Sequence, residues 1–333
     1  MPTLPPEQAR VSGLQPAEPP EPAEPPKLPE PAEPAEPGAP KSGPIQPPGP
    51  PEPEPAPGPA EPREAHQARE VAESFGSDAE RYDRARPGYP AALVERIIAA
   101  SRSPGPSPGP SPGVLDVGCG TGIAARQFQA AGCRVLGVDP DARMAVLARQ
   151  RGLEVEVTTF EAWDPAGRAF DAVVAAQAWH WVDPLAGAAK AARALRPGGR
   201  LAVFWNAFQP PPGLAEAFAE VYRKVMPNAP NVGMRPILEV YLTMCGKAAD
   251  GIRQAGAFGD PEQWEFRWER PYTRDEWLDQ VPTFGGGAQL PRAMLEDLLA
   301  GLGAAIDAAG GSFTMHYTTV AVAAARTGAP LRP

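Results

Sequence analysis

One short stretch of this sequence places an acid and three glycines where they could bind a small molecule. Residues 114–122 read VLDVGCGTG, an aliphatic segment that contains Asp116 and continues into alternating glycines. This pattern predicts a buried strand, a tight turn and a helix that begins at Ile123. Glycine permits positive φ and close approach of a ligand, and the free N–H groups of a helix N-terminus favour an anionic group. The stretch therefore predicts a ligand site at the carboxyl end of a strand, where open α/β sheets bind.

A second acid stands at the end of the next predicted strand. Residues 134–138 are mostly aliphatic and are followed by Asp139, about twenty residues after the glycines. A carboxylate at this place can accept hydrogen bonds from both hydroxyls of a ribose. The local sequence Asp139-Pro140-Asp141 is also typical of a helix cap. The distance from the glycines favours the ligand role.

A histidine between two tryptophans follows the predicted fourth strand, residues 170–175. His180 stands between Trp179 and Trp181, beside the expected site. A neutral imidazole near pH 7 could take a proton from a nucleophile, so His180 is a candidate general base. A histidine among aromatic residues can equally form part of a pocket wall, and the sequence leaves both roles open.

The glycine stretch resembles a known family motif. Asp116, Gly118, Gly120 and Gly122 stand as Asp-x-Gly-x-Gly-x-Gly, which resembles the first motif of class I methyltransferases that use S-adenosylmethionine. A dinucleotide fingerprint would be Gly-x-Gly-x-x-Gly, but its third glycine position is occupied by Ile123. No Gly-Lys-Ser/Thr of a P-loop follows. The residues around His180 resemble the fourth-strand motif of the type 11 methyltransferase group.

The resemblance implies a fold and a set of site residues. The implied fold is an α/β, Rossmann-like, doubly wound sheet of seven strands, with the last strands antiparallel and helical inserts that cover the substrate. The implied cofactor is S-adenosyl-L-methionine, and His180 is the candidate catalytic residue. The residues expected to bind the cofactor are Asp116, Gly118, Gly120, Gly122, Asp139, Phe160, Glu161 and Gln177.

The implied reaction is an in-line transfer of a methyl group to an oxygen, nitrogen or carbon atom of a small molecule. Two alternatives stay open at this point. One is a nicotinamide-dependent oxidoreductase, which the glycine spacing and the absence of a Tyr-x-x-x-Lys pair disfavour. The other is a non-catalytic cofactor-binding scaffold that acts through the N-terminal tail.

Composition divides the chain into two unequal parts. The chain has 333 residues and 47 prolines, and roughly half of these prolines lie before Arg63. Residues 1–69 predict a disordered tail, because apolar side chains are too sparse there to offset the entropy lost on folding. Residues 70–333 are expected to form the methyltransferase domain. Within it, segments 207–260 and 273–309 are expected to cover the substrate.

Charge and cysteine content narrow the range of partners. Most of the net charge of −9 falls in the tail, and a nearly neutral domain attracts nucleic acid little. The N-terminus lacks the basic start and apolar run of a signal peptide, and no apolar run of about 18 residues is present, so a cytoplasmic protein without a membrane partner is expected. The 3 cysteines lack metal-ligand spacing, so we expect buried thiols and no metal. The oligomeric state is not indicated.

Three further expectations concern the surroundings of the site. Residues 76–90 are rich in turn formers, and in the resembling family such a segment folds over the cofactor. Residues 200–205 predict a fifth strand, after which Asn206 is expected to leave the sheet. Residues 282–285 resemble a loop that faces the substrate in the family.

Overall fold

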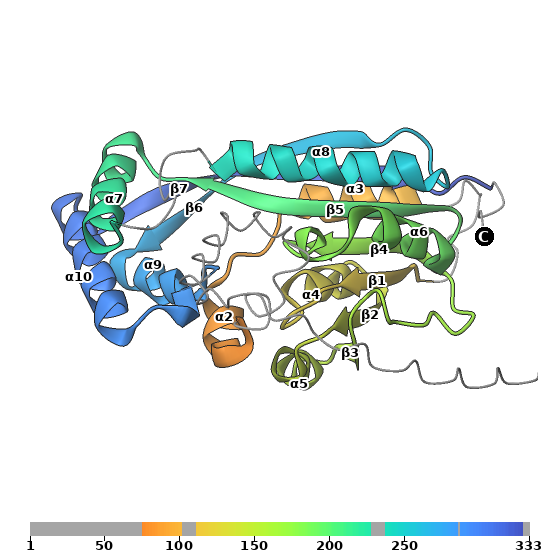
Figure 1. The fold of residues 1–333 in the computed structure, drawn as a ribbon, viewed down its shortest axis with the longest axis horizontal. Helices are drawn as coiled ribbons and strands as arrows, with labels where there is room; N and C mark the ends of the chain where they lie inside the picture. The colour runs from red at the N-terminus through yellow and green to blue at the C-terminus, as the bar shows by residue number, and fades with distance from the viewer. Residues whose placement is uncertain (1–74, 102–110, 228–236, 286, 329–333) are drawn as a thin grey trace, which may run out of the picture. The chain divides into compact units, whose positions relative to one another are not determined.

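A computed structural model of the protein describes residues 75–101, 111–227, 237–285 and 287–328. The predicted tail, residues 1–69, lies outside the described residues. The described part contains a seven-stranded sheet with the strand order β3-β2-β1-β4-β5-β7-β6 (Figure 1). Strand β7 is antiparallel to both of its neighbours, and the other neighbouring pairs are parallel. The predicted doubly wound sheet with antiparallel last strands is confirmed.

The strands are β1 (Gly113–Val117), β2 (Arg134–Asp139), β3 (Glu154–Val157), β4 (Phe170–Ala176), β5 (Leu195–Gln209), β6 (Glu262–Thr273) and β7 (Ser312–Ala325). The α-helices are α2 (Ala79–Ala85), α3 (Ala91–Ser101), α4 (Ile123–Ala130), α5 (Ala142–Gln150), α6 (Pro184–Ala194), α7 (Pro212–Val225), α8 (Ile237–Ala255), α9 (Arg274–Gln280) and α10 (Arg292–Ala308). Short 3₁₀ turns are η2 (Phe75–Asp78), η3 (Trp179–Trp181), η4 (Val281–Thr283) and η5 (Gly287–Gln289).

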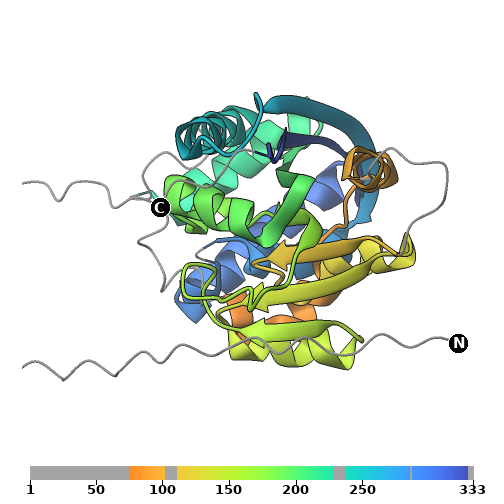
Figure 2. The same ribbon diagram turned by 90° about the vertical axis from the view of Figure 1, so that its right-hand side faces the viewer.

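Helices cover both faces of the sheet (Figure 2). Successive residues of a strand point to opposite faces, and in the central strands both series are apolar. Leu115 and Val173 pack with α6 and α8 on one face. Val114 and Val174 pack with α3, α4 and α5 on the other. Strands that are buried on both faces explain why β1 and β4 read as continuous aliphatic runs.

A separate core lies at the far ends of the last three strands. There α7, α9 and α10 gather around the extended ends of β5, β6 and β7 (Figure 1). Tyr272, Trp277, Leu302 and Met315 are buried in this core. Helix α8 behaves differently, because it packs along the sheet beside α6. The predicted insert 207–260 therefore supplies both a sheet-covering helix and a helix of the far core.

Asn206 does not leave the sheet, and that prediction is wrong. Strand β5 continues to Gln209, because β7 pairs with it up to His316. Asn206 is 4% exposed. Its side-chain amide donates to the Gly88 carbonyl at 3.0 Å and its side-chain oxygen accepts from the Thr319 hydroxyl at 2.6 Å. A polar residue can stay in a buried strand when its hydrogen bonds are met by distant parts of the chain.

The prediction of a turn-rich segment over residues 76–90 is wrong for its first half. Helix α2 forms there, and the Asp78 side chain caps it by accepting from the Arg81 N–H at 3.0 Å. The helix ends where the Arg86 N–H donates to the Tyr82 carbonyl at 3.1 Å, just before Pro87. Asp78 and Pro87 are typical of the start and the end of a helix, but the same residue types are also typical of turns.

Two glycines of α8 give a matched test of this packing. A Cβ at Gly251 would lie 2.4 Å from the Pro184 carbonyl oxygen, whereas a Cβ at Gly246 would meet no described atom within 4 Å. We expect Gly251→Ala to lower the free energy of unfolding by about 1–3 kcal/mol, because α8 must move away from α6. Gly246→Ala should raise it by about 0.5–1 kcal/mol, since alanine is the better helix former.

Urea denaturation of the two full-length variants and the parent measures this difference. Equal effects of the two substitutions would contradict the close approach of α8 to the start of α6.

Candidate functional site

A cavity of about 1150 Å³ opens at the carboxyl ends of the parallel strands. Its lining residues fall into two groups, which we call the glycine-loop half and the helical half. The glycine-loop half is lined by residues 117–121, 138–141, 159–161 and 176–178, which follow β1, β2, β3 and β4. The helical half is lined mainly by aromatic and aliphatic side chains from the end of β5 and from α7, α8, α9, η4 and α10. These include Phe208, Phe218, Tyr222, Leu238, Tyr241, Met244, Trp277, Phe284, Leu295 and Leu298.

The glycine loop is held against the end of β2. The N–H groups of Gly118 and Cys119 donate to the Val138 carbonyl at 2.8 and 3.2 Å. Gly118 has φ +65°, and a Cβ there would lie 2.4 Å from the Ala178 Cβ. Gly120 has φ +55° and lines the cavity. Gly118 is required because a side chain there would collide with Ala178, and Gly120 is favoured because its backbone is left-handed.

Asp139 lies at the centre of this half. It is 7% exposed and lines the cavity. One carboxylate oxygen accepts from the Gly120 N–H at 2.7 Å and the other from the Asp141 N–H at 2.9 Å. Burial raises the pKa of Asp139 to about 6, although these two N–H groups oppose the rise. Each carboxylate oxygen keeps a further lone pair that a ligand hydroxyl could use.

Asp116 lies behind the glycine loop. It is fully buried and is not among the described residues that line the cavity. Neither carboxylate oxygen has a hydrogen-bond partner within the described part of the chain. Burial, with a smaller contribution from the charge of Asp139, raises its pKa to about 8. The structure thus places Asp116 beside the site, and direct contact with a ligand stays a prediction.

The residues after β3 line the cavity in two different environments. Phe160 is 4% exposed and packs with Trp163 and Trp179 at ring-centroid distances of 6.1 and 6.2 Å. Glu161 is exposed, and its backbone carbonyl accepts from the Lys190 ammonium. Phe160 can form one apolar wall for a planar ring, and the Glu161 side chain has no fixed partner among the described residues.

Gln177 has an uncommon backbone and an unpaired oxygen. Its φ is +57°, in the left-handed region that is rare for residues other than glycine and often marks functional sites. The Gln177 N–H donates to the Phe204 carbonyl at 2.9 Å, and its side-chain amide lies 3.5 Å from the Tyr241 hydroxyl. Its buried Oε1 has no partner among the described residues. This oxygen can accept a hydrogen bond from a bound molecule.

His180 lines the cavity but is not arranged as a base. The Trp205 indole N–H donates to its Nδ1 at 3.2 Å, which puts the hydrogen of the neutral ring on Nε2. Burial lowers the pKa of His180 to about 4. Nδ1 is occupied and Nε2 carries a hydrogen, so neither nitrogen offers a free lone pair to a nucleophile. This arrangement favours the pocket-wall alternative, and the role of His180 as a general base stays a prediction.

Sequence reasoning missed several residues that line the cavity. Tyr82 and Arg86 come from the segment that was expected to be a turn, and its aromatic and basic composition was the available signal. Tyr241 and Trp277 come from the helical segments that were expected to cover a substrate, where no local pattern distinguishes a lining residue from a core residue. Residues 282–285 contribute Phe284 and Gly285 to the lining.

Comparison with known proteins finds similarity to methyltransferases over part of the chain. Residues 115–203 match the methyltransferase domain of type 11. An uncharacterized methyltransferase of Mycobacterium tuberculosis is 37% identical over 143 residues, which cover 41% of this chain and 54% of that protein. A ubiquinone biosynthesis O-methyltransferase of Methylocella silvestris is 38% identical over 93 residues, which cover 26% and 36%. The chain thus spans about half, or less, of the length of these relatives.

A solved structure from Anaeromyxobacter dehalogenans, provisionally assigned as a type II methyltransferase, aligns with a TM-score of 0.50 and 22% identity. The alignment covers 72% of this chain and 97% of that one, which supports a shared fold. Residues 115–203 thus resemble a methyltransferase domain of type 11, and the described sheet has the fold of a solved methyltransferase structure. The cofactor expected for such a domain is S-adenosyl-L-methionine.

The residues of the methyltransferase domain fit this cofactor. Two buried side-chain oxygens that line the cavity, Thr121 Oγ1 and Gln177 Oε1, lack partners within the described ranges. The first turn of α4 follows Gly122, which provides no side-chain cap, so its N–H groups can meet a carboxylate. Asp139 supplies acceptors for hydroxyls. The donor and acceptor types thus match an amino acid group and a ribose.

Two other findings bear on possible partners. None of the described helices is both long enough and apolar enough to cross a bilayer. The described ranges contain no cluster of three or more His, Cys, Asp or Glu side chains that could bind a metal ion. The cysteines Cys119, Cys133 and Cys245 are buried, as the sequence predicted.

The environment of His180 leads to a testable titration. Because its pKa in the folded chain lies below the ordinary 6.5, the unfolded chain takes up a proton first as the pH falls from 6.5 to 4. His180 should therefore make folding less favourable over this window, by up to about 1.4 kcal/mol for each pH unit. Proton NMR of the His180 ring should show a midpoint near 4.

Trp205→Phe, which removes the indole donor, is the control that identifies the His180 resonance. A His180 midpoint near 6.5 in the folded parent would contradict the buried, hydrogen-bonded ring.

Proposed function

We propose that the protein transfers a methyl group from S-adenosyl-L-methionine to a small-molecule acceptor held in the helical half of the cavity. The observation that supports this proposal is the continuity of one cavity from the glycine loop into a chamber lined by α7, α8, α9 and α10. Its volume of about 1150 Å³ exceeds the usual range of about 300–1,000 Å³ for a pocket that holds one ligand. There is room for the cofactor and an acceptor together.

In this proposal the glycine-loop half binds the cofactor. Asp139 accepts hydrogen bonds from the ribose hydroxyls, and Gly118, Gly120 and Gly122 let the backbone approach the methionine part. Phe160 and Glu161 border the adenine, Gln177 Oε1 accepts from a polar group, and Asp116 supports the cofactor site from behind the loop.

The proposed reaction asks little of catalytic side chains. The cofactor supplies a methyl group on a positively charged sulfur, which makes the carbon open to in-line attack. The chain holds the acceptor atom about 3–3.5 Å from that carbon, and such positioning is worth roughly 7–11 kcal/mol. In this account His180 shapes the wall, and its Nε2–H can donate a hydrogen bond into the cavity.

A small acceptor is supported by how the chamber is built. The helices that line it also form a core with β6 and β7, so the walls are packed protein. A nucleic acid or protein substrate would need an open surface, and a nearly neutral domain attracts nucleic acid weakly. Segments 207–260 and 273–309 are proposed as substrate covers, within a methyltransferase domain over residues 70–333. A cytoplasmic location belongs to the same proposal.

Asp139 provides the sharpest test of the cofactor half. Asp139→Ala should weaken S-adenosylmethionine binding by roughly tenfold to a hundredfold or more, because hydrogen bonds to a charged acceptor are worth about 1.5–3 kcal/mol. Titration calorimetry on the full chain measures the dissociation constant. Part of the loss is expected through the glycine loop, since Asp139 also holds the Gly120 N–H.

Glu154→Gln is the matched control, because Glu154 is an exposed acid on neighbouring β3 that does not line the cavity. The dissociation constant of this variant should stay within about twofold of the parent's, since an exposed surface charge contributes little. An unchanged dissociation constant in a folded Asp139→Ala protein would end the assignment of Asp139.

A further inference from the structure

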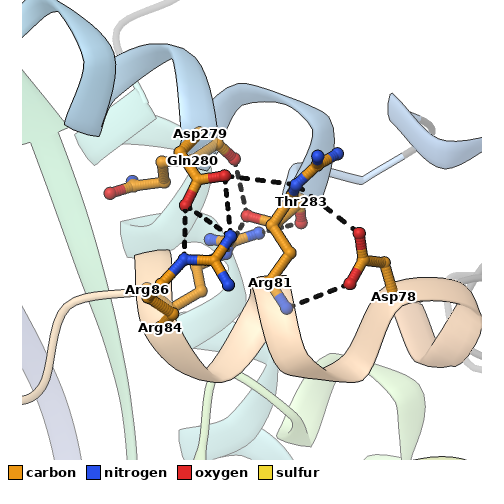
Figure 3. Close-up of polar contacts among 7 residues, drawn as sticks. All are labelled: Asp78, Arg81, Arg84, Arg86, Asp279, Gln280 and Thr283. Carbon is orange, nitrogen blue, oxygen red and sulfur yellow. Dashed lines mark hydrogen bonds and ion pairs between the residues drawn. The ribbon is translucent and has the colours of Figure 1, made fainter.

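One cationic side chain reaches the cavity without an acidic partner. Arg86 follows α2 and lines the cavity beside Tyr82 and Phe284. Figure 3 shows it next to Arg81 and Arg84, which face α9. Those two arginines pair with Asp279, Arg84 through two hydrogen bonds of 2.9 Å. Within the described ranges, no carboxylate lies within ion-pair distance of Arg86.

Arg86 is fixed in place by neutral contacts. Its Nε–H donates to the Thr283 hydroxyl at 2.9 Å, and one Nη donates to the Thr283 carbonyl. Its Cζ lies 5.1 Å from the Tyr82 ring centroid and 4.8 Å from that of Phe284. A guanidinium has five N–H donors, so three remain without a partner among the described residues. This is a preorganised fork for a bidentate anion.

The negative charge of the cavity lies elsewhere. Its acidic lining residues are Asp139, Asp141 and Glu161, which follow β2 and β3 in the glycine-loop half. The helical half, as far as the structure describes it, is lined by no acid. Arg86 therefore gives the acceptor side a single positive charge within an apolar chamber. Such a charge disfavours a cationic acceptor and attracts an anion.

Among the described residues, the same side of the cavity offers no base. His180 has Nδ1 occupied by the Trp205 N–H and a hydrogen on Nε2. Burial raises the pKa of Tyr222, Tyr241 and Tyr317, so these phenols keep their protons at neutral pH. A hydroxyl or ammonium acceptor must lose a proton on methylation, and no described lining residue of the helical half is arranged to take it. An acceptor that is already an anion needs no base.

We propose, on the basis of the methyl transfer proposed above, that the acceptor is an apolar carboxylic acid whose carboxylate is bound by Arg86 and is itself methylated. One carboxylate oxygen forms a bond to the methyl carbon while the carbon–sulfur bond of the cofactor breaks and its electron pair returns to sulfur. The products are a methyl ester and the neutral thioether, and no proton is released. The aromatic and aliphatic side chains of the helical half hold the hydrocarbon body.

The first test measures binding of three chain-matched probes, dodecanoate, dodecanol and dodecylamine, to the full chain loaded with S-adenosylhomocysteine. Dodecanoate should bind at least tenfold more tightly than the other two. Arg86→Gln should weaken dodecanoate binding by roughly tenfold to a hundredfold, as expected for hydrogen bonds between charged groups, and should leave dodecanol binding nearly unchanged. Equal affinities for the three probes, or the same preference in Arg86→Gln, would overturn the proposal.

Arg84→Gln is the matched control for a structural effect. It removes a positive charge from the same segment and breaks the pair with Asp279, but Arg84 does not line the cavity. The preference for dodecanoate should survive in Arg84→Gln. Arg86→Lys keeps the positive charge but lacks the two parallel N–H donors of a guanidinium. It should therefore show a preference for dodecanoate between those of Arg86→Gln and the parent.

The second test follows the transferred methyl group. With methyl-labelled cofactor and dodecanoate, the label should appear in a product that mild alkali hydrolyses to methanol, and the pH of a weakly buffered reaction should not fall. Label transferred instead to dodecanol or dodecylamine, with one proton released for each methyl group, would overturn the carboxylate assignment and leave methyl transfer standing. Failure of S-adenosylhomocysteine to bind at all would reject the proposed function itself.

Discussion

The hydrogen bond from the Gly120 N–H to Asp139 is the constraint on which the site depends. Parallel pairing of β1 and β2 places Val117 beside Val138, so the loop after β1 begins where β2 ends. The N–H groups of residues 118–120 then donate hydrogen bonds to the Val138 carbonyl and the Asp139 carboxylate. The loop can take this path because Gly118 and Gly120 have positive φ. An acid beside a glycine loop thus both shapes the loop and faces the cavity.

The same sheet builds the other half of the cavity. Strands β5 and β7 pair over ten positions, from Arg200 to Gln209 on β5, and run on from the methyltransferase core to the helices α7, α9 and α10. The chamber is therefore fixed to the cofactor side by continuous strands. On the opposite side, Arg84 of α2 and Asp279 of α9 connect the N-terminal segment to these helices. Arg86 is held next to this connection, between the two halves.

The sequence predicted the parts of the fold that local patterns encode. Continuous aliphatic runs revealed β1, β2 and β4, and the glycine spacing with Asp139 located one half of the cavity. Features that depend on distant partners were missed. Asn206 stays in the sheet because Thr319 and Gly88 form hydrogen bonds with its side chain. The tautomer of His180 is set by the hydrogen bond from Trp205. The Arg86 contact with Thr283 joins positions 197 residues apart, which no local spacing reveals.

The measurement that tests the central claim most directly is calorimetric titration of the full chain with S-adenosylhomocysteine and, separately, with NAD⁺. The arrangement of the glycine loop, Thr121, Asp139 and Gln177 predicts saturable one-to-one binding of S-adenosylhomocysteine and no detectable heat with NAD⁺. Binding of NAD⁺ without binding of S-adenosylhomocysteine would contradict the account and favour a nicotinamide enzyme on the same fold.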